Sequence, residues 1–143
     1  IIMAKIQEEP WLGYGFDGFW HGIYGESLYV QNALMWDLPN AHNGFLDLML
    51  EVGVIGIAIL ALYVWATFIK GLAILRTSFA WKHTWALTYI VYLLMINTSE
   101  SSLANQNDPQ TVLMTIAFTS ISVEFSNLFN STKFNDRQLT SSS

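Results

Sequence analysis

The chain has 143 residues, of which 52% are hydrophobic, 15% aromatic and only 12% charged. This share of charge is about half that of an ordinary soluble domain and favours a protein that lies in lipid. Six Lys and Arg stand against eleven Asp and Glu, for a net charge of −5, so no basic stripe is available to neutralise a nucleic-acid backbone and we expect no nucleic-acid partner. The absence of cysteine excludes disulfides and thiolate metal sites.

Residues 1–43 are rich in Gly, Pro, Trp and Tyr and have no sustained helical or alternating period. We therefore expect an extracytoplasmic loop region at a membrane surface, where aromatic rings are favoured. The start at Ile1, with no leader pattern, suggests a fragment of a longer chain. The tract PWLGYGFDGF contains G-x-G-x-x-G at Gly13, Gly15 and Gly18, but no strand precedes it and no helix follows, so we expect tight turns and no nucleotide cofactor.

Residues 52–69 form an uncharged run of 18 residues, which as a helix would cover roughly 27 Å of hydrocarbon. Asn43 is a good helix N-cap, so we expect the first span at 44–69. Gly53 and Gly56 on this span are expected to permit close helix packing. The basic residues Lys70 and Arg76 predict a cytoplasmic loop at 70–80.

Further apolar stretches predict second and third spans at 81–97 and 110–125, followed by a flexible polar tail at 126–143. The expected transmembrane helical region is thus 44–125, behind the loop region 1–43. The predicted fold class is all-α and integral to the membrane, with about three transmembrane helices that form the C-terminal part of a larger polytopic bundle.

This topology places the loop region and Glu100 on the same outer face, so His42, Asn43, Asp47, Glu51 and Glu100 are candidates for one site. The carboxylates of Asp47 and Glu51 are one helical turn apart and repel unless another group engages them. A neutral imidazole at a helix N-terminus suits a general base. The alternatives are that His42 is a capping or interfacial residue and that the two acids only complement the helix dipole. His21 and His83 lack partners at ligand spacing, so we expect no metal.

The tract from Pro10, followed by His42-Asn43, nine residues, Gly53, two residues and Gly56, resembles the O-antigen ligase and exopolysaccharide polymerase family. That family carries Pro-x-x-Gly-x-Gly-Phe in a periplasmic loop and then His-Asn with the same glycine spacing. The Asn-x-Ser-Glu-Ser pattern that begins at Asn97 is also similar. The resemblance covers about residues 8–125 and does not extend into the tail.

The resemblance implies a metal-independent, inverting glycosyltransferase in the bacterial inner membrane, with its motif on the periplasmic side. The donor would be a polyprenyl-diphosphate-linked glycan and the acceptor lipid A core or a growing glycan, as in lipopolysaccharide or exopolysaccharide biosynthesis. His42 would match the essential histidine, as a base or as a contact to the diphosphate. Asn43, Asp47 and Glu51 would be supporting groups, and Glu100 an addition to them.

One feature departs from the family, which places outward-facing arginines against the donor diphosphate. Arg76 and Arg137 are both expected on the cytoplasmic side, so the remaining transmembrane helices of a full-length protein would have to supply that charge. Two other functions remain open. One is a non-catalytic membrane component of polysaccharide export, which keeps the motif for helix packing. The other is a small three-span protein unrelated to glycans.

Overall fold

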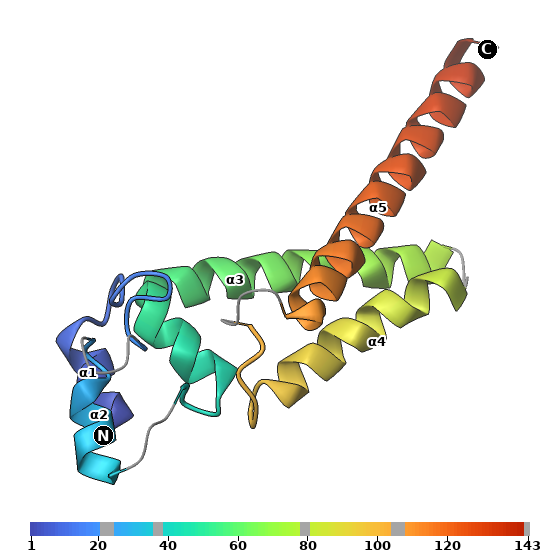
Figure 1. Cartoon of the computed structure of the whole chain (residues 1–143). Helices are drawn as coiled ribbons and strands as arrows, with labels where there is room; N and C mark the ends of the chain where they lie inside the picture. Colours follow the sequence, from blue (N-terminus) through green and yellow to red (C-terminus); the bar gives the residue numbers. More distant parts are fainter. Residues whose placement is uncertain (21–24, 36–38, 78–80, 104–107, 142–143) are drawn as a thin grey trace.

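The computed structural model describes residues 1–20, 25–35, 39–77, 81–103 and 108–141, with the side chains of 81–83 and 132–141 left undescribed. All regular secondary structure in these ranges is helical, which confirms the predicted all-α class (Figure 1). The helices are α1 (Ile2–Glu8), α2 (Leu28–Leu34), α3 (Gly44–Thr77), α4 (Trp81–Ile96) and α5 (Pro109–Ser141).

The N-terminal region is not a continuous loop, because it contains the two short helices α1 and α2. They gather against the start of α3 around a small core of four fully or nearly fully buried side chains, Ile6, Phe19, Val30 and Leu50. The Phe19 ring packs edge-on against Trp20, with the ring centroids 4.9 Å apart. Aromatic burial of this kind stabilises a small core that two seven-residue helices alone would not hold together. The sequence pattern missed these helices because neither is long enough to show a helical period.

Helix α3 begins at Gly44, as the predicted N-cap at Asn43 required. The side-chain Oδ1 of Asn43 accepts hydrogen bonds from the amides of Phe45 and Leu46, both at 3.1 Å, so the cap is confirmed. The helix is broken at Gly53, whose φ of 64° and ψ of −168° are not helical. Figure 1 shows the change of direction between the first turns of α3 and its long remainder.

Helices α3, α4 and α5 share a second core. Helix α4 runs back along α3, and α5 packs against both before it projects away from them (Figure 1). The buried members of this core are Ile74, Ala86, Leu87, Ile90, Ala117, Phe118 and Ile121. Two boundaries differ from expectation. Helix α3 continues to Thr77 through most of the expected loop, and α5 continues to Ser141 through most of the expected tail.

Two of the described helices are long and apolar enough to cross a membrane, α3 and the part Pro109–Ser131 of α5. The apolar part of α4, Thr84–Ile96, is shorter than such a helix needs to be. In the most apolar stretches of the two long helices only 11% and 17% of residues are buried inside the protein. Most residues in these stretches therefore face outward, and only a minority contribute to the core shared by α3, α4 and α5.

Candidate functional site at the start of helix α3

The turn at residues 40–43 leads into α3 and presents His42. His42 has φ 52°, in the left-handed region that side chains with a Cβ seldom adopt, and its side chain is exposed. Its amide donates to Oδ1 of Asn40 at 2.9 Å, which closes a small side-chain-to-backbone turn. Residues held in this conformation cluster at functional sites, and here Asp17 and Met35 share it with His42.

Asp47, one turn into α3, lies beneath this turn and is 1% exposed. Its carboxylate accepts the Ala41 amide at 2.9 and 3.1 Å through its two oxygens, and the Trp20 indole N–H at 2.8 Å. The Ser101 hydroxyl donates to its Oδ2. Three donors from three segments thus satisfy a buried negative charge, which would otherwise be costly to remove from water.

The same end of α3 is joined to the loop that follows α4. The Gly44 amide donates to the carbonyls of Asn97 at 3.0 Å and Glu100 at 3.1 Å, and Nδ2 of Asn43 donates to the Thr98 carbonyl at 3.0 Å. Asn97 is fully buried, and its Oδ1 accepts the amides at 102 and 103. A Cβ at Gly44 would collide with the Asn97 side chain, lying 2.9 Å from its Cγ. Glycine therefore allows the two segments to meet.

Residues 10–15, which we call the strap, lie across the break in α3. The Tyr14 and Gly15 amides donate to the carbonyls of Leu50 at 2.7 Å and Glu51 at 2.9 Å. In the other direction, the amides of residues 54 and 55 donate to the carbonyls of residues 10 and 11, at 2.9 and 3.2 Å. These four bonds satisfy backbone groups that the break at Gly53 removes from the helical pattern. The glycines of the motif therefore have a structural role.

Gly53, which was expected to permit close helix packing, is in close contact with the strap and not with another helix. A Cβ at Gly53 would strike the Trp11 carbonyl and lie 2.6 Å from the Leu12 nitrogen, both in the strap. A Cβ at Gly56 would strike Val52 of its own helix. The close approach is thus between a helix and a loop segment, at a residue with a positive φ that glycine adopts without strain.

Glu51 lies under the turn that follows the strap and is 4% exposed. The Asp17 backbone amide donates to its carboxylate, whereas its Oε2 has no hydrogen-bond partner among the described residues. Burial and then the nearby Asp47 charge raise the pKa of Glu51 to about 7, so Glu51 lies close to the carboxylate beneath the His42 turn. Oε2 of Glu51 is thus a buried acceptor that none of the described residues satisfies.

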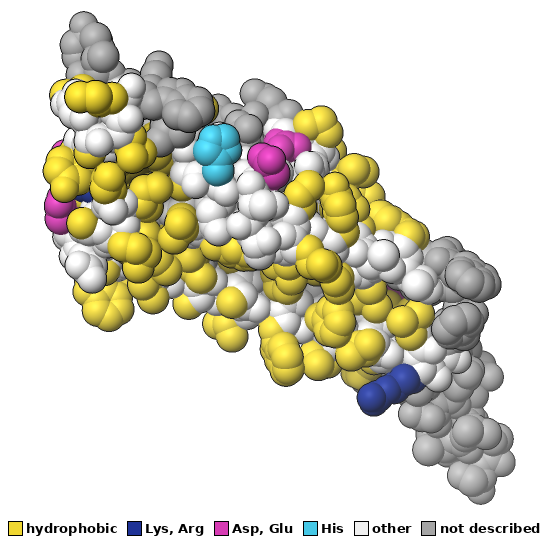
Figure 2. Space-filling view, turned by 90° about the horizontal axis from the view of Figure 1, so that it is seen from below, with side chains coloured by type: hydrophobic (Ala, Val, Ile, Leu, Met, Phe, Trp, Pro, Cys, Tyr) yellow, Lys and Arg dark blue, Asp and Glu magenta, His cyan; other side chains and the backbone are white. Residues whose placement is uncertain are grey.

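The five predicted site residues thus differ in their burial and in their contacts. Asn43 caps α3, Asp47 is a buried acceptor and Glu51 is buried beneath the strap, whereas His42 and Glu100 are exposed. The Glu100 carbonyl accepts from Gly44, two residues after His42, so the loop after α4 does meet the His42 turn. On the face in Figure 2 the histidine lies beside acidic side chains, and hydrophobic side chains are spread over much of the remaining described surface.

Sequence reasoning missed two residues that bond Asp47, namely Trp20 and Ser101. Trp20 is 27 residues from Asp47 and Ser101 is 54 residues away, and no spacing rule connects such positions. Their side chains meet Asp47 only because the N-terminal core and the loop after α4 both dock on the first turn of α3. Ser101 did fall in the family-like pattern after Asn97, which was the one available hint.

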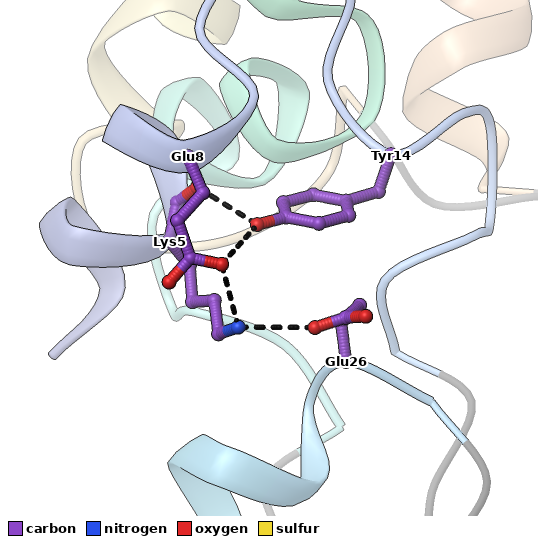
Figure 3. Close-up of polar contacts among 4 residues, drawn as sticks. All are labelled: Lys5, Glu8, Tyr14 and Glu26. Atoms are coloured by element: carbon purple, nitrogen blue, oxygen red, sulfur yellow. Dashed lines mark hydrogen bonds and ion pairs between the residues drawn. The ribbon is translucent and has the colours of Figure 1, made fainter.

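The basic side chain near this end of the molecule forms ion pairs with neighbouring carboxylates. Lys5 is the only Lys or Arg before residue 70, and its Nζ lies 2.8 Å from Glu8 and 3.0 Å from Glu26 (Figure 3). Hydrogen bonds to Glu8 and Glu26 raise the pKa of Lys5 well above its usual range, and the bond from Lys5 lowers the pKa of Glu8. Lys5 is therefore committed to an internal ion-pair cluster, and no described group takes the place of the family's diphosphate-binding arginines.

Within the described ranges, no three His, Cys, Asp or Glu side chains are grouped so that they could hold a metal ion. In comparisons with known proteins, no family model, no curated protein and no solved structure matches this chain.

Proposed function

We propose that this chain is a membrane-embedded part of a glycosyltransferase that uses a polyprenyl-diphosphate-linked glycan, with His42 as its reactive group. The main support is the conformation of His42, a left-handed, exposed histidine on a turn whose neighbours are all fixed. Strain of this kind is retained where the surrounding structure enforces it. The resemblance of the His42-Asn43 and glycine pattern to the O-antigen ligase and exopolysaccharide polymerase family supplies the reaction class.

In the proposed reaction, an acceptor hydroxyl on lipid A core or on a growing glycan attacks the anomeric carbon of the donor sugar. The new carbon–oxygen bond forms as the bond to the diphosphate breaks on the opposite face, which inverts the anomeric centre. The hydroxyl proton passes to the His42 imidazole, and the polyprenyl diphosphate leaves with the electron pair. This needs His42 within hydrogen-bond reach of the hydroxyl, and an exposed ring is open to such an approach.

The membrane setting is part of the same proposal. The long apolar part of α3 begins just beyond the strap, and two described helices have the length and composition to cross a bilayer. His42 would then lie at the membrane edge, on the periplasmic side of a bacterial inner membrane, where a lipid-linked donor presents its diphosphate. The donor diphosphate would still require cations from elsewhere in the protein, because Lys5 is paired.

The test is His42→Asn in the full-length protein, assayed in membranes with a radiolabelled polyprenyl-diphosphate-linked oligosaccharide. Asparagine tolerates the left-handed conformation, so this change removes the imidazole and keeps the turn. We expect transfer to fall roughly a hundredfold or more, the usual contribution of a general base. His83→Asn, the same substitution in α4, should leave transfer unchanged. Full transfer by His42→Asn would remove His42 from the chemistry.

One observation favours the non-catalytic alternative, a membrane component of polysaccharide export. Gly13 and Gly53 belong to the family-like pattern, and both are accounted for by the contact between the strap and the helix break. If the whole pattern were kept for packing, His42→Asn would leave glycan export and transfer intact, while substitutions at Gly53 would impair both through loss of folded protein.

A further inference from the structure

The turn that carries His42 is held by a buried junction in which Trp20, Asp47 and Ser101 meet. We infer that this junction is a positioning device, in which Trp20 and Ser101 orient the Asp47 carboxylate and the carboxylate in turn clamps the Ala41 amide beside His42. The inference rests on the proposed function, because it assigns positioning residues to His42 as the reactive group.

The geometry of the clamp is specific. Both oxygens of Asp47 face the Ala41 amide, at 2.9 and 3.1 Å, and Oδ1 also accepts the Trp20 indole N–H at 2.8 Å. The Ser101 hydroxyl donates to Oδ2. An ionised carboxylate has acceptor sites for all three donors. The hydrogen bonds from Trp20 and Ser101 prevent it from rotating away from Ala41.

The clamp acts on residues that are fixed on both sides. After Ala41, the His42 amide is bound by Asn40, and Asn43 is tied to both the α3 amides and the Thr98 carbonyl. The backbone from 41 to 43 therefore has little freedom, and the left-handed φ of His42 is imposed by its neighbours. A backbone held in this way presents the imidazole from a fixed point, which reduces the reorganisation needed when a substrate arrives.

The junction also joins three parts of the chain. Trp20 comes from the N-terminal core, Asp47 from the first turns of α3, and Ser101 from the loop after α4. Burial of a carboxylate at this point is costly unless every donor is present, so the site forms only when the three segments are docked together. The position of His42 is thereby coupled to the docking of the outer loops.

The experiment uses two substitutions in the full-length protein, each with a matched control. Asp47→Asn keeps the size of the side chain but loses the charge and one acceptor oxygen, and Asp108→Asn makes the same change at the start of α5. Ser101→Ala removes the donor, Ser101→Thr keeps it, and Ser99→Ala removes a hydroxyl from the exposed part of the same loop. Hydrogen exchange of the Ala41 amide reports the clamp, and transfer from a radiolabelled polyprenyl-diphosphate-linked oligosaccharide reports its effect on His42.

We expect exchange at Ala41 to accelerate about tenfold or more in Asp47→Asn and Ser101→Ala, and to stay near wild type in Ser101→Thr and in both controls. For transfer, kcat should fall roughly tenfold to a hundredfold in the same two variants, with KM unchanged and with Ser101→Thr restoring the rate. A merely structural role would accelerate exchange throughout the N-terminal core and the first turns of α3 and lower the amount of folded protein, while kcat per folded protein stayed unchanged.

Unchanged exchange at Ala41 in Asp47→Asn would overturn the inference, as would a fall in kcat that Ser101→Thr does not restore. The exchange measurement needs no substrate, so it separates the two proposals. If His42→Asn retains transfer while Ala41 responds as expected, the clamp exists but does not serve catalysis at His42, and the positioning inference is wrong together with the proposed function. If His42→Asn is inactive while Ala41 does not respond, only the positioning inference fails.

Discussion

At the residue scale, the glycines of the N-terminal motif turn out to be structural. Gly13 lies against the backbone of residues 50 and 51, and Gly53 lies against that of residues 11 and 12, with φ values of 65° and 64°. A Cβ on Gly13 would lie 2.7 and 2.8 Å from the carbonyl carbon and oxygen of Glu51. Neither position has room for a side chain, and both use a conformation that other residues adopt only with strain. The motif spacing therefore reflects a backbone-to-backbone contact.

We predict that Gly53→Ala lowers the free energy of unfolding by at least ~2 kcal/mol, because the left-handed conformation and the loss of strap hydrogen bonds both add to the cost. Gly15→Ala is the matched control. Gly15 also has a positive φ, 94°, but a Cβ there would meet nothing within 4 Å, so only the conformational cost of about 1 kcal/mol remains. Denaturation by SDS in detergent micelles measures both. Equal losses in the two variants would refute the steric role of Gly53.

Some of this residue-scale detail was accessible from the sequence and some was not. The cap at Asn43 was predictable because capping depends on local chemistry, a polar side chain before an apolar run. The break at Gly53 was not, because a glycine within a long apolar run looks the same whether it packs against a helix or ends one. The strap distinguishes the two cases, and its contact with Gly53 is a tertiary contact between residues distant in the sequence.

At the element scale, α1 is too short to be stable alone and depends on its contacts. Lys5 bonds Glu8 within α1 and reaches Glu26 just before α2, while the Tyr14 hydroxyl donates to the Lys5 carbonyl at 2.9 Å (Figure 3). The Lys5 ammonium also lies 5.3 Å from the centroid of the Tyr29 ring in α2. This cluster ties α1 and α2 together beside the strap. Its members are exposed except for Lys5 and Tyr14, so each bond is individually weak.

The two pKa shifts in this cluster define a pH window. The pKa of Glu8 is lowered, so its contribution is present above about pH 4.3 and is lost as the pH falls through the lower folded value. The pKa of Lys5 is raised, so its contribution is complete below about pH 10.4 and is lost as the pH rises through the higher folded value. The docking of α1 should therefore loosen in acid and remain unaffected across neutral pH.

We predict that Glu8→Gln accelerates hydrogen exchange in α1 roughly two- to fivefold at pH 7, after correction for intrinsic rates, the range expected for an exposed ion pair. Acidification should bring the wild type toward the variant, because protonation of Glu8 removes the same partner. Glu9→Gln, an adjacent exposed carboxylate outside the Lys5 cluster, is the control and should behave as wild type. A wild type and a Glu8→Gln variant that differ equally at pH 3 and pH 7 would contradict the assignment.

At the scale of the whole molecule, two separate cores divide the chain. One is the N-terminal core around Phe19 and Leu50, and the other is the core shared by α3, α4 and α5. The outer faces of α3 and α5 remain covered with large exposed apolar side chains, such as Leu62 at 68% and Trp65 at 66%. Apolar surface of that extent on consecutive turns requires lipid or other helices. The composition alone indicated a lipid environment, because that inference depends on how few residues are charged and not on how the chain folds.

The number and placement of the spans were harder to predict. The three expected segments correspond to α3, α4 and α5, but the boundaries at residues 70 and 125 were set by charge and polarity. Helix α3 continues past Lys70 because a charged side chain does not interrupt backbone hydrogen bonding, and a long lysine stem can lie along apolar surface. The tail continues as helix because α5 has no proline or glycine after Pro109 to end it. Hydropathy marks where lipid is tolerated and not where a helix stops.

The absence of cysteine from the chain makes the membrane arrangement directly testable. If α3 crosses the bilayer, single-cysteine variants at its two ends lie on opposite sides. Ser99→Cys places a thiol in the exposed loop beside the His42 turn, and Thr77→Cys places one at the exposed end of α3. In intact cells a membrane-impermeant maleimide should label Ser99→Cys and leave Thr77→Cys unlabelled until the membrane is opened. Labelling of both from one side would show that α3 does not cross, and the reverse pattern would put His42 on the cytoplasmic side, where a periplasmic glycan transfer could not use it.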